Sequence, residues 1–198
     1  MTALLLAAAL AANPAPDGVD RLSAALSGAR AWQAEFVQLY TPEGFEDGTT
    51  DRGRLVIAPP ARLRFDYTSG SPRVFAADGG IGRLVDASAG SCEAVRLDAG
   101  TWGRLPLATA LDPAATRRAF AVEGSGQTVR LVPREPGPEL SEVIVTLDRA
   151  NLPRTVTVRD ASGNRNQFTF SGWRPAAVPA PAFFQPALPG SRPCQPEQ

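Results

Sequence analysis

The chain has 198 residues, of which 43% are hydrophobic and 20% are charged, so one globular domain with a buried core is the simplest expectation. Its net charge is zero and its pI is near 6.3, which leaves no basic excess for binding nucleic acid or an anionic membrane surface. It has no histidine, which excludes Ser-His-Asp and Cys-His catalysis and zinc sites that need imidazole.

The N-terminal residues 1–12 form an apolar run that ends in small residues, Ala9-Leu10-Ala11, and is followed by prolines. The run has the character of the hydrophobic segment and cleavage site of a secretory signal peptide, although the usual positive residues before it are missing. It is too short to cross a bilayer as a helix. We expect export, with residues 13–190 as a single domain and 191–198 as a flexible tail; the alternative is an alanine-rich disordered start.

Residues 18–37 begin with helical spacing of apolar side chains and then pass into a strand, and Asp17 or Asp20 can cap the helix. The rest of the chain is mostly short alternating runs that are separated by Gly, Asp and Asn turn residues. Strands are predicted at residues 35–40, 52–67 (split at Pro59-Pro60), 73–78, 82–87, 92–98, 119–124, 128–133, 141–148, 154–160 and 166–173.

In the stretch RGRLVIAPPARLRFDY, residues 52–67, apolar side chains alternate with arginines. Successive side chains of a strand point to opposite faces, so the stretch predicts a sheet with one apolar face and one arginine face. The apolar set is Leu55, Ile57, Leu63, Phe65 and Tyr67. The opposite set is Arg52, Arg54, Arg62 and Arg64. We interpret Arg62 and Arg64 as a solvated face, with partner docking as the alternative.

Residues 103–120 interrupt the strand pattern with a crowded apolar segment that contains Leu105, Leu107 and Leu111. Asp112-Pro113 can start a new helical turn, so a short helical pair is expected here. After Trp173 the prolines exclude a central strand, although residues 182–184 can add an edge element.

Strands in meander order without the spacing of βαβ units predict a mainly β protein with short helices, built on one large curved antiparallel sheet or open barrel. The apolar face then lies inside the curl, and the two helical segments form a lid over it. A packed core is the simplest interpretation of that face. Two short helices, however, are too small to cover eight or more strands fully. An apolar cup that is incompletely filled and has a loose lid could bind a lipid. One half-enclosed acyl chain would contribute roughly 6 kcal/mol to the free energy of binding.

Cys92 and Cys194 are too far apart in sequence for a CxxC redox pair. In an exported protein they are expected to form one disulfide that ties the proline-rich tail to the body. The alternative is two free buried thiols.

The order of several motifs resembles the LolA family of periplasmic lipoprotein carriers and its relatives LolB and RseB. WQAEFVQLY is similar to the family's helix running into a strand, and GRLVIAPPARLRFDY to its Gly, apolar strand, Pro and aromatic-rich strand. AADGGIGRLVD lies at its Asp-Gly hairpin, residues 131–173 are similar to its terminal strands, and AFFQPALPG is similar to its closing element. The resemblance covers about residues 20–190.

The resemblance implies an unclosed half-barrel with a helical lid that holds lipoprotein acyl chains in the periplasm of a Gram-negative cell and acts without a cofactor, as a monomer. An inner-membrane ABC-type complex would load it, and an outer-membrane acceptor would receive the cargo. The cup would be lined by Leu55, Ile57, Leu63, Phe65 and Tyr67, with Leu105, Leu107 and Leu111 facing it from the lid. This chain has Pro59 where family members carry an Arg that bonds the lid, so a latch has to come from elsewhere.

Three other functions stay open at the level of sequence. The first is a lipid sensor or regulator built on the same cup, and the second is a carrier for another lipid. The third is an enzyme, for which the carboxylates Asp66, Asp78, Asp148 and Asp160 are available. Three of these lie at turns or strand ends, where Asp is expected for backbone reasons, and no nucleophile elbow or phosphate-binding loop is present. We therefore predict that the chain is not an enzyme.

Overall fold

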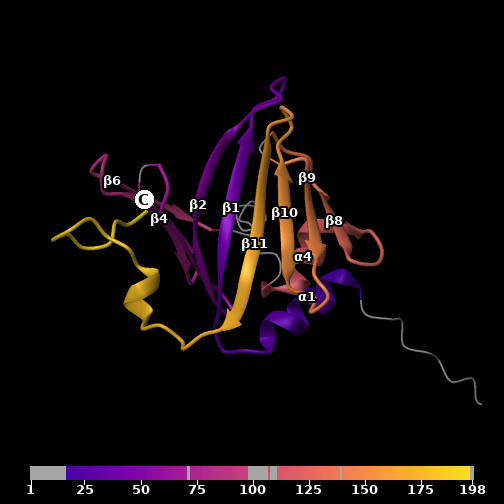
Figure 1. The fold of residues 1–198 in the computed structure, drawn as a ribbon, viewed down its shortest axis with the longest axis horizontal. Helices are drawn as coiled ribbons and strands as arrows, with labels where there is room; N and C mark the ends of the chain where they lie inside the picture. Colours follow the sequence, from indigo (N-terminus) through magenta and orange to yellow (C-terminus); the bar gives the residue numbers. More distant parts are fainter. Residues whose placement is uncertain (1–16, 71, 98–106, 108–110, 139, 197–198) are drawn as a thin grey trace, which may run out of the picture.

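The computed structural model describes residues 17–70, 72–97, 107, 111–138 and 140–196 (Figure 1). Strands dominate, as predicted, and the helices are short. In chain order the elements are α1 (Gly18–Ser27), β1 (Trp32–Thr41), β2 (Thr49–Ala58), β3 (Arg62–Tyr67), β4 (Arg73–Asp78), β5 (Ile81–Asp86), β6 (Ser91–Arg96), α4 (Pro113–Ala119), β7 (Phe120–Glu123), β8 (Thr128–Pro133), β9 (Glu142–Leu147), β10 (Pro153–Arg159), β11 (Arg165–Pro175) and the 3₁₀ helix η1 (Pro181–Phe184).

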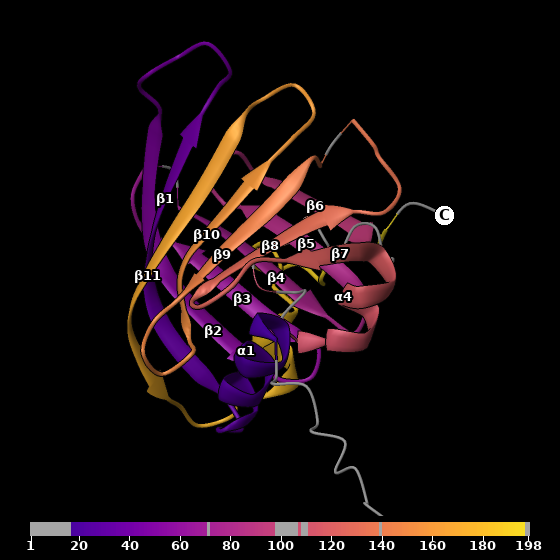
Figure 2. The ribbon, with the colours of Figure 1, turned by 90° about the vertical axis from the view of Figure 1, so that its right-hand side faces the viewer.

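The strands form one antiparallel sheet in the order β6-β5-β4-β3-β2-β1-β11-β10-β9-β8-β7. Two meanders, β1 to β6 and β7 to β11, are joined where β1 pairs with β11. The sheet curls round α1 and α4 without closing, because β6 and β7 remain its two edges (Figure 2). The predicted fold class, an unclosed half-barrel with helices over its inner face, is confirmed.

Both helices begin where the sequence predicted a cap. The Asp17 carboxylate accepts hydrogen bonds from the backbone N–H groups of Val19 and Asp20 at the start of α1. Asp112 does the same for α4: its Oδ1 accepts from the N–H of Ala115 at 2.8 Å, and Pro113 fills the first turn. These caps satisfy backbone donors that the first helical turn leaves unpaired.

The core lies on the inner face of the sheet, between the strands and α1. The helix contributes Val19, Leu22 and Leu26, and the sheet contributes one side chain in two from most strands, as the alternation requires. Each Leu or Phe buried here contributes about 1.5–3 kcal/mol relative to an exposed position. The buried residues that the sheet contributes to this cluster are Phe36, Leu55, Ile57, Leu63, Phe65, Ala77, Phe120, Val129, Leu131, Val143, Val145, Leu147, Val156, Phe168 and Phe170.

The C-terminal segment crosses the outer face of the first meander. Instead of the expected edge element, Phe183 and Phe184 belong to a 3₁₀ helix, because Pro181 has no N–H to give to a strand ladder. Phe184 is fully buried against Ala31 and Ala58 in a second, smaller apolar cluster. The segment therefore covers the face opposite the core.

Arginines of the outer face hold this segment. Arg64 donates to the carbonyl of Phe183 at 2.6 Å, pairs with Asp66 at 2.7 Å and stacks its guanidinium 4.4 Å from the Phe183 ring centroid. Arg62 stacks over Phe184. The side chain of Arg64 is only 18% exposed, so the prediction of a solvated arginine face is wrong at this position. Arginine suits both roles because its planar cation stacks on rings while its N–H groups donate.

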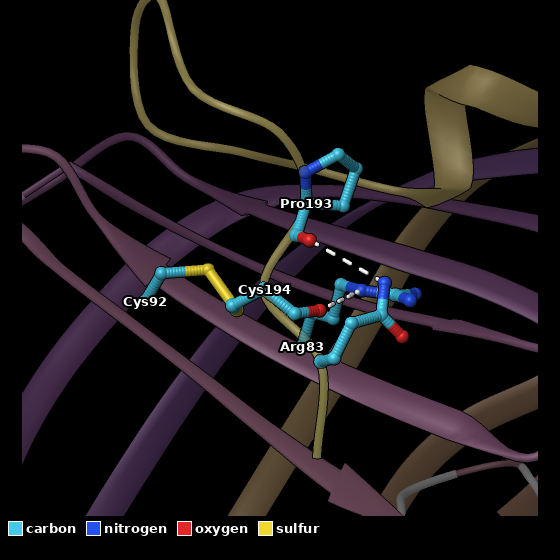
Figure 3. Close-up of a disulfide and its surroundings, with 5 residues drawn as sticks. Arg83, Cys92, Pro193 and Cys194 are labelled. Carbon is cyan, nitrogen blue, oxygen red and sulfur yellow. Dashed lines mark hydrogen bonds between the residues drawn. A yellow bond between two sulfur atoms is a disulfide. The ribbon is translucent and has the colours of Figure 1, made fainter. Parts of the chain in front are cut away.

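The predicted disulfide joins Cys92 of β6 to Cys194, with Cα atoms 6.0 Å apart and 102 positions apart in sequence. Figure 3 shows the side chain of Arg83 reaching the C-terminal segment beside this bond. Arg83 is buried and its Nε donates to the carbonyl of Cys194 at 2.9 Å. The end of the chain is thus attached to the outer face by a covalent bond and by a buried cation.

Candidate binding site on the inner face of the sheet

The structure brings the predicted inner-face residues together. Leu55, Ile57 and Leu63 are 0% exposed, Phe65 is 2% exposed, and Tyr67 packs against the same cluster. Adjacent strands pair these residues directly, Leu55 with Phe65 and Ile57 with Leu63. The apolar side chains that alternate along residues 52–67 therefore form the inner wall of the sheet.

The lid residues are placed in part. Leu107 is buried in the core cluster, and Leu111, just before α4, packs against it from a half-buried position. Leu105 lies outside the described residues. Leu107 has a backbone φ of 73°, a left-handed conformation that costs a non-glycine residue about 1–2 kcal/mol. Leu107 is therefore buried on the inner face in a backbone conformation that non-glycine residues rarely adopt.

Three aromatic residues that were not predicted as part of the wall, Phe36, Phe168 and Phe170, join Phe65 and Tyr67 on the inner face. The ring of Phe36 contacts Phe65, Tyr67 and Phe168, with centroids 5.2, 5.1 and 6.0 Å apart. Phe168 continues this contact to Phe170. The alternation in residues 35–40 and 166–173 indicates that these residues form strands with one apolar face. It does not indicate that the two strands are neighbours, which follows only from the pairing of β1 with β11.

Gly53 makes the contact between Phe36 and Tyr67 possible. In the sheet it lies between them, paired with Phe36 on one side and with Tyr67 on the other. A Cβ at this position would lie 2.7 Å from the Phe36 ring and would collide with the carbonyl of Asp66. The missing side chain lets two rings from strands two places apart meet edge to face, a geometry that aromatic pairs favour.

Polar groups surround Tyr67 at the end of the apolar wall. Arg73 stacks 4.3 Å from the Tyr67 ring centroid and pairs with Asp51 at 2.6 Å. Burial raises the pKa of Tyr67 to about 12, and the nearby Asp51 charge acts in the same direction while Arg73 opposes it. The hydroxyl therefore stays protonated at neutral pH and can donate a hydrogen bond to a polar group beside the wall.

Within the described part of the chain, α1 and α4 are joined by an exposed ion-pair cluster, here called the Arg117 clasp. Arg117 of α4 contacts Asp17 at 2.8 Å and Asp20 at 2.7 Å, at the start of α1. Burial opposes ionisation of Asp17, but the Asp20 N–H and Arg117 outweigh it and lower its pKa below the ordinary value. The three side chains are 37–46% exposed, so the clasp contributes no more than about 1 kcal/mol per pair.

The two helices differ in how firmly they are held. α1 buries three apolar side chains, and the indole N–H of Trp32 donates to the carbonyl of Leu26 near its end. The buried residue of α4 is Thr116, and the helix is seven residues long. Short helices depend on tertiary packing for their stability, so α4 is the weaker part of the cover.

The central residues of the inner wall are covered in this structure. Leu55, Ile57 and Leu63 are 0% exposed and so are surrounded by protein atoms; any ligand would reach them only after part of what covers them had moved. Three surface hollows lined by described residues have polar walls; one, of about 290 Å³, lies between the start of α1 and the β7–β8 turn. Across the described part of the chain, neither a cluster of metal-binding side chains nor a helix long and apolar enough to cross a membrane is found.

An unclosed antiparallel sheet with an apolar inner face and a separate helical cover defines a half-barrel binding protein. The model of the outer membrane lipoprotein carrier protein LolA matches residues 27–187 of the chain. The chain belongs to the LolA family. A similar curated protein is the outer-membrane lipoprotein carrier protein of Chromobacterium violaceum, 26% identical over 193 residues that make up 96% of this chain and 92% of the relative. Members of this family are carrier proteins rather than enzymes.

Comparison with solved structures finds distant similarities at low sequence identity. The MucA/MucB complex of Pseudomonas aeruginosa contains a chain with a TM-score of 0.48 and 17% identity; the match covers 87% of this chain and 62% of that one. A LolA superfamily protein from Nitrosomonas europaea gives a TM-score of 0.47 at 9% identity, over 84% of this chain and 95% of the other. This chain thus spans less than two thirds of the matched chain in the MucA/MucB complex.

Proposed function

We propose that this protein is a periplasmic carrier that shields the acyl chains of lipoproteins against the inner face of its sheet and delivers them to an outer-membrane acceptor. The observation that carries the proposal is the contrast within the inner face: a continuous aromatic and aliphatic wall lies under a cover joined by exposed ion pairs. Membership of the LolA family supports the same function.

The physical problem that such a carrier solves is the cost of hydrocarbon in water. Each methylene withdrawn from water contributes about 0.8 kcal/mol, so a half-enclosed acyl chain gains roughly 6 kcal/mol. Part of that gain is offset because the cover must give up its own contacts with the wall. The balance favours moderate binding, from which a better-matched acceptor can take the cargo.

The roles of the residues follow from their places. Leu55, Ile57, Leu63 and Phe65 form the wall that would contact the acyl chain, and Leu107 and Leu111, with Leu105, would be displaced by it. The Tyr67 hydroxyl lies at one end of the wall, where it can donate to an ester or glyceryl oxygen. The partners implied by the family are an inner-membrane ABC-type complex and an outer-membrane acceptor, and residues 1–12 would serve as the export signal.

The test is native mass spectrometry of the protein purified from the periplasm, followed by organic extraction. We expect a population whose added mass equals an acylated lipoprotein or its lipid, lost on extraction. The same protein, emptied and offered a fluorescent fatty acid, should take it up. A preparation that carries no alkyl-chain ligand and fails to take up the probe would contradict the proposal, and a free phospholipid in every preparation would favour a carrier of another lipid.

A further inference from the structure

The tip of the β1–β2 hairpin presents two exposed aromatic side chains. Phe45 is 70% exposed and Tyr40 is 41% exposed, and neither contributes to the two apolar clusters. Figures 1 and 2 show the hairpin extending beyond the rest of the sheet, at the end away from α1. An exposed Phe at a loop tip adds almost nothing to the stability of the fold, so its apolar surface is available to a partner.

The loop that carries Phe45 is ordered by hydrogen bonds rather than by packing. The Phe45 N–H donates to the carbonyl of Pro42 at 3.2 Å, which closes a turn. The Glu43 N–H donates at 3.0 Å to the side chain of Asn164, in the neighbouring β10–β11 turn. Asn164 is in turn fixed by two bonds to the Asp160 carboxylate, at 2.7 and 2.9 Å. A tip held in this way loses little conformational entropy when it docks.

The charged side chains of the tip itself are all negative, whereas Arg159 and Arg165 of the neighbouring strands lie at its base and line a surface hollow with Glu43 and Phe45. Glu43, Glu46 and Asp47 are exposed around Phe45, and residues 40–51 contain no Lys or Arg, although the whole chain has a net charge of zero. Such a group repels an anionic lipid surface and attracts a basic protein surface. The charge of residues 42–48 therefore favours a basic protein surface over an anionic membrane as the partner.

We propose that residues 42–48, here called the acidic tip, are a docking element for a folded protein that presents Lys and Arg around an apolar pocket for Phe45. Phe45 acts as the buried anchor, and the three carboxylates guide the approach and fix the orientation. Because the tip lies at the end of the sheet away from α1, docking there leaves the cover free to move. The proposal rests on the carrier function only in that the partner is one that supplies or receives the cargo.

The first experiment is to place p-benzoylphenylalanine at position 45 of the full chain in the host cell and to crosslink under ultraviolet light. Position 178 is the matched control, because Val178 is also an exposed apolar residue, on the C-terminal segment. The protein captured at position 45 is then purified, and its affinity for unmodified carrier is measured at low and high salt. The variants are Phe45→Ala, Val178→Ala and a triple variant, Glu43→Gln with Glu46→Gln and Asp47→Asn.

We expect Phe45→Ala to weaken binding at least tenfold and Val178→Ala to leave it unchanged. The triple variant should lower the association rate at least tenfold at low salt and abolish most of its salt dependence. Equal capture at both positions, full binding by Phe45→Ala, or crosslinking to vesicles of anionic phospholipid instead of to a protein would overturn the proposal. Fatty-acid uptake is measured in parallel: if wild-type protein docks but takes up no fatty acid, the carrier function fails while the docking element stands.

Discussion

The two faces of strands β2 and β3 are both covered, but by different means. The outer face lies under the C-terminal segment, which is held by the Cys92–Cys194 disulfide, by the Arg64 bond to Phe183 and by the buried Arg83. The inner face lies under α1 and α4, whose link to each other is the exposed Arg117 clasp. A disulfide crosslinks the outer cover to the sheet, whereas α1 and α4 are held by apolar packing and exposed ion pairs, so the proposed carrier function assigns the movement to the inner cover.

The difference follows from what each cover can bury. The C-terminal segment is rich in proline and makes no ladder with the sheet, so Phe184 and the arginine contacts must be supplemented by a crosslink. The inner face instead attracts any apolar cover, because its aromatic wall is poorly hydrated. In the proposed carrier, a lipid tail would compete with the helices for that wall through the same hydrophobic effect.

The largest expected effect comes from removing the centre of the inner wall. Phe65→Ala should lower the free energy of unfolding by about 3–5 kcal/mol, because Phe65 is buried against Phe36 and Phe168. Urea denaturation measures the change. Phe45→Ala is the matched control, and its effect should stay within about 0.5 kcal/mol. A loss below about 1 kcal/mol for Phe65→Ala would mean that the wall is not packed as the structure has it.

Breaking the outer fastening should have the next largest effect. Because its cysteines are 102 positions apart in sequence, loss of the disulfide in Cys92→Ser with Cys194→Ser should cost about 2–4 kcal/mol. Limited proteolysis should then cut the C-terminal segment first, while fatty-acid uptake is retained. If uptake fell on loss of the disulfide while the fold persisted, the inner cover would depend on the outer one, and the two would not be independent.

Arg64→Ala tests the arginine part of the same fastening. Loss of a charge-assisted bond and a ring contact should lower the free energy of unfolding by about 1–2 kcal/mol. Arg54→Ala removes an exposed arginine of β2 from the same outer face of the sheet, and it should change the free energy of unfolding by less than about 0.5 kcal/mol. Equal effects of the two substitutions would restore the interpretation of a solvated arginine face.

Arg117→Ala should affect stability least and opening most. Its pairs are exposed, so we expect a loss below about 1 kcal/mol, together with faster uptake of a fluorescent fatty acid, measured by stopped flow. Arg118→Ala, which removes an exposed arginine from the same helix, should leave the uptake rate unchanged. An unchanged rate in Arg117→Ala would show that the clasp does not limit opening.

The clasp also predicts a small pH dependence. The pKa of Asp17 is lowered in the folded protein, so its contribution is complete above its unfolded value of about 3.9 and is lost as the pH falls through the lowered folded value. The stability difference between wild type and Arg117→Ala should therefore be constant from pH 7 to 5 and should shrink below about pH 4. A difference that grew on acidification would contradict the assignment.

Periodicity and local turn chemistry were enough to predict the inner wall and the helix starts. The alternation of Leu55, Ile57, Leu63 and Phe65 determines which face each side chain takes, and Asp112 precedes a proline that suits the first turn. These signals are local, so they can be read without the fold.

Contacts between distant segments could not be predicted in this way. The stacking of Arg64 on Phe183 and the pairing of Arg117 with Asp17 join residues about a hundred positions apart, and nothing in either local sequence names the partner. The role of Gly53 could not be predicted either, because it depends on the aromatic rings of both neighbouring strands. The sequence therefore showed that Pro59 stands where family members carry an Arg, but not which residues hold the cover in place of that Arg.

The most direct test of the central claim uses a fatty acid that carries a diazirine near its methyl end, crosslinked to the purified protein and mapped by mass spectrometry. If the inner wall receives hydrocarbon, labels should fall on peptides that contain Leu55, Ile57, Leu63 or Phe65, and their yield should rise in Arg117→Ala. Labels confined to exposed apolar positions such as Phe45 and Val178, with the wall unlabelled in both proteins, would contradict the account.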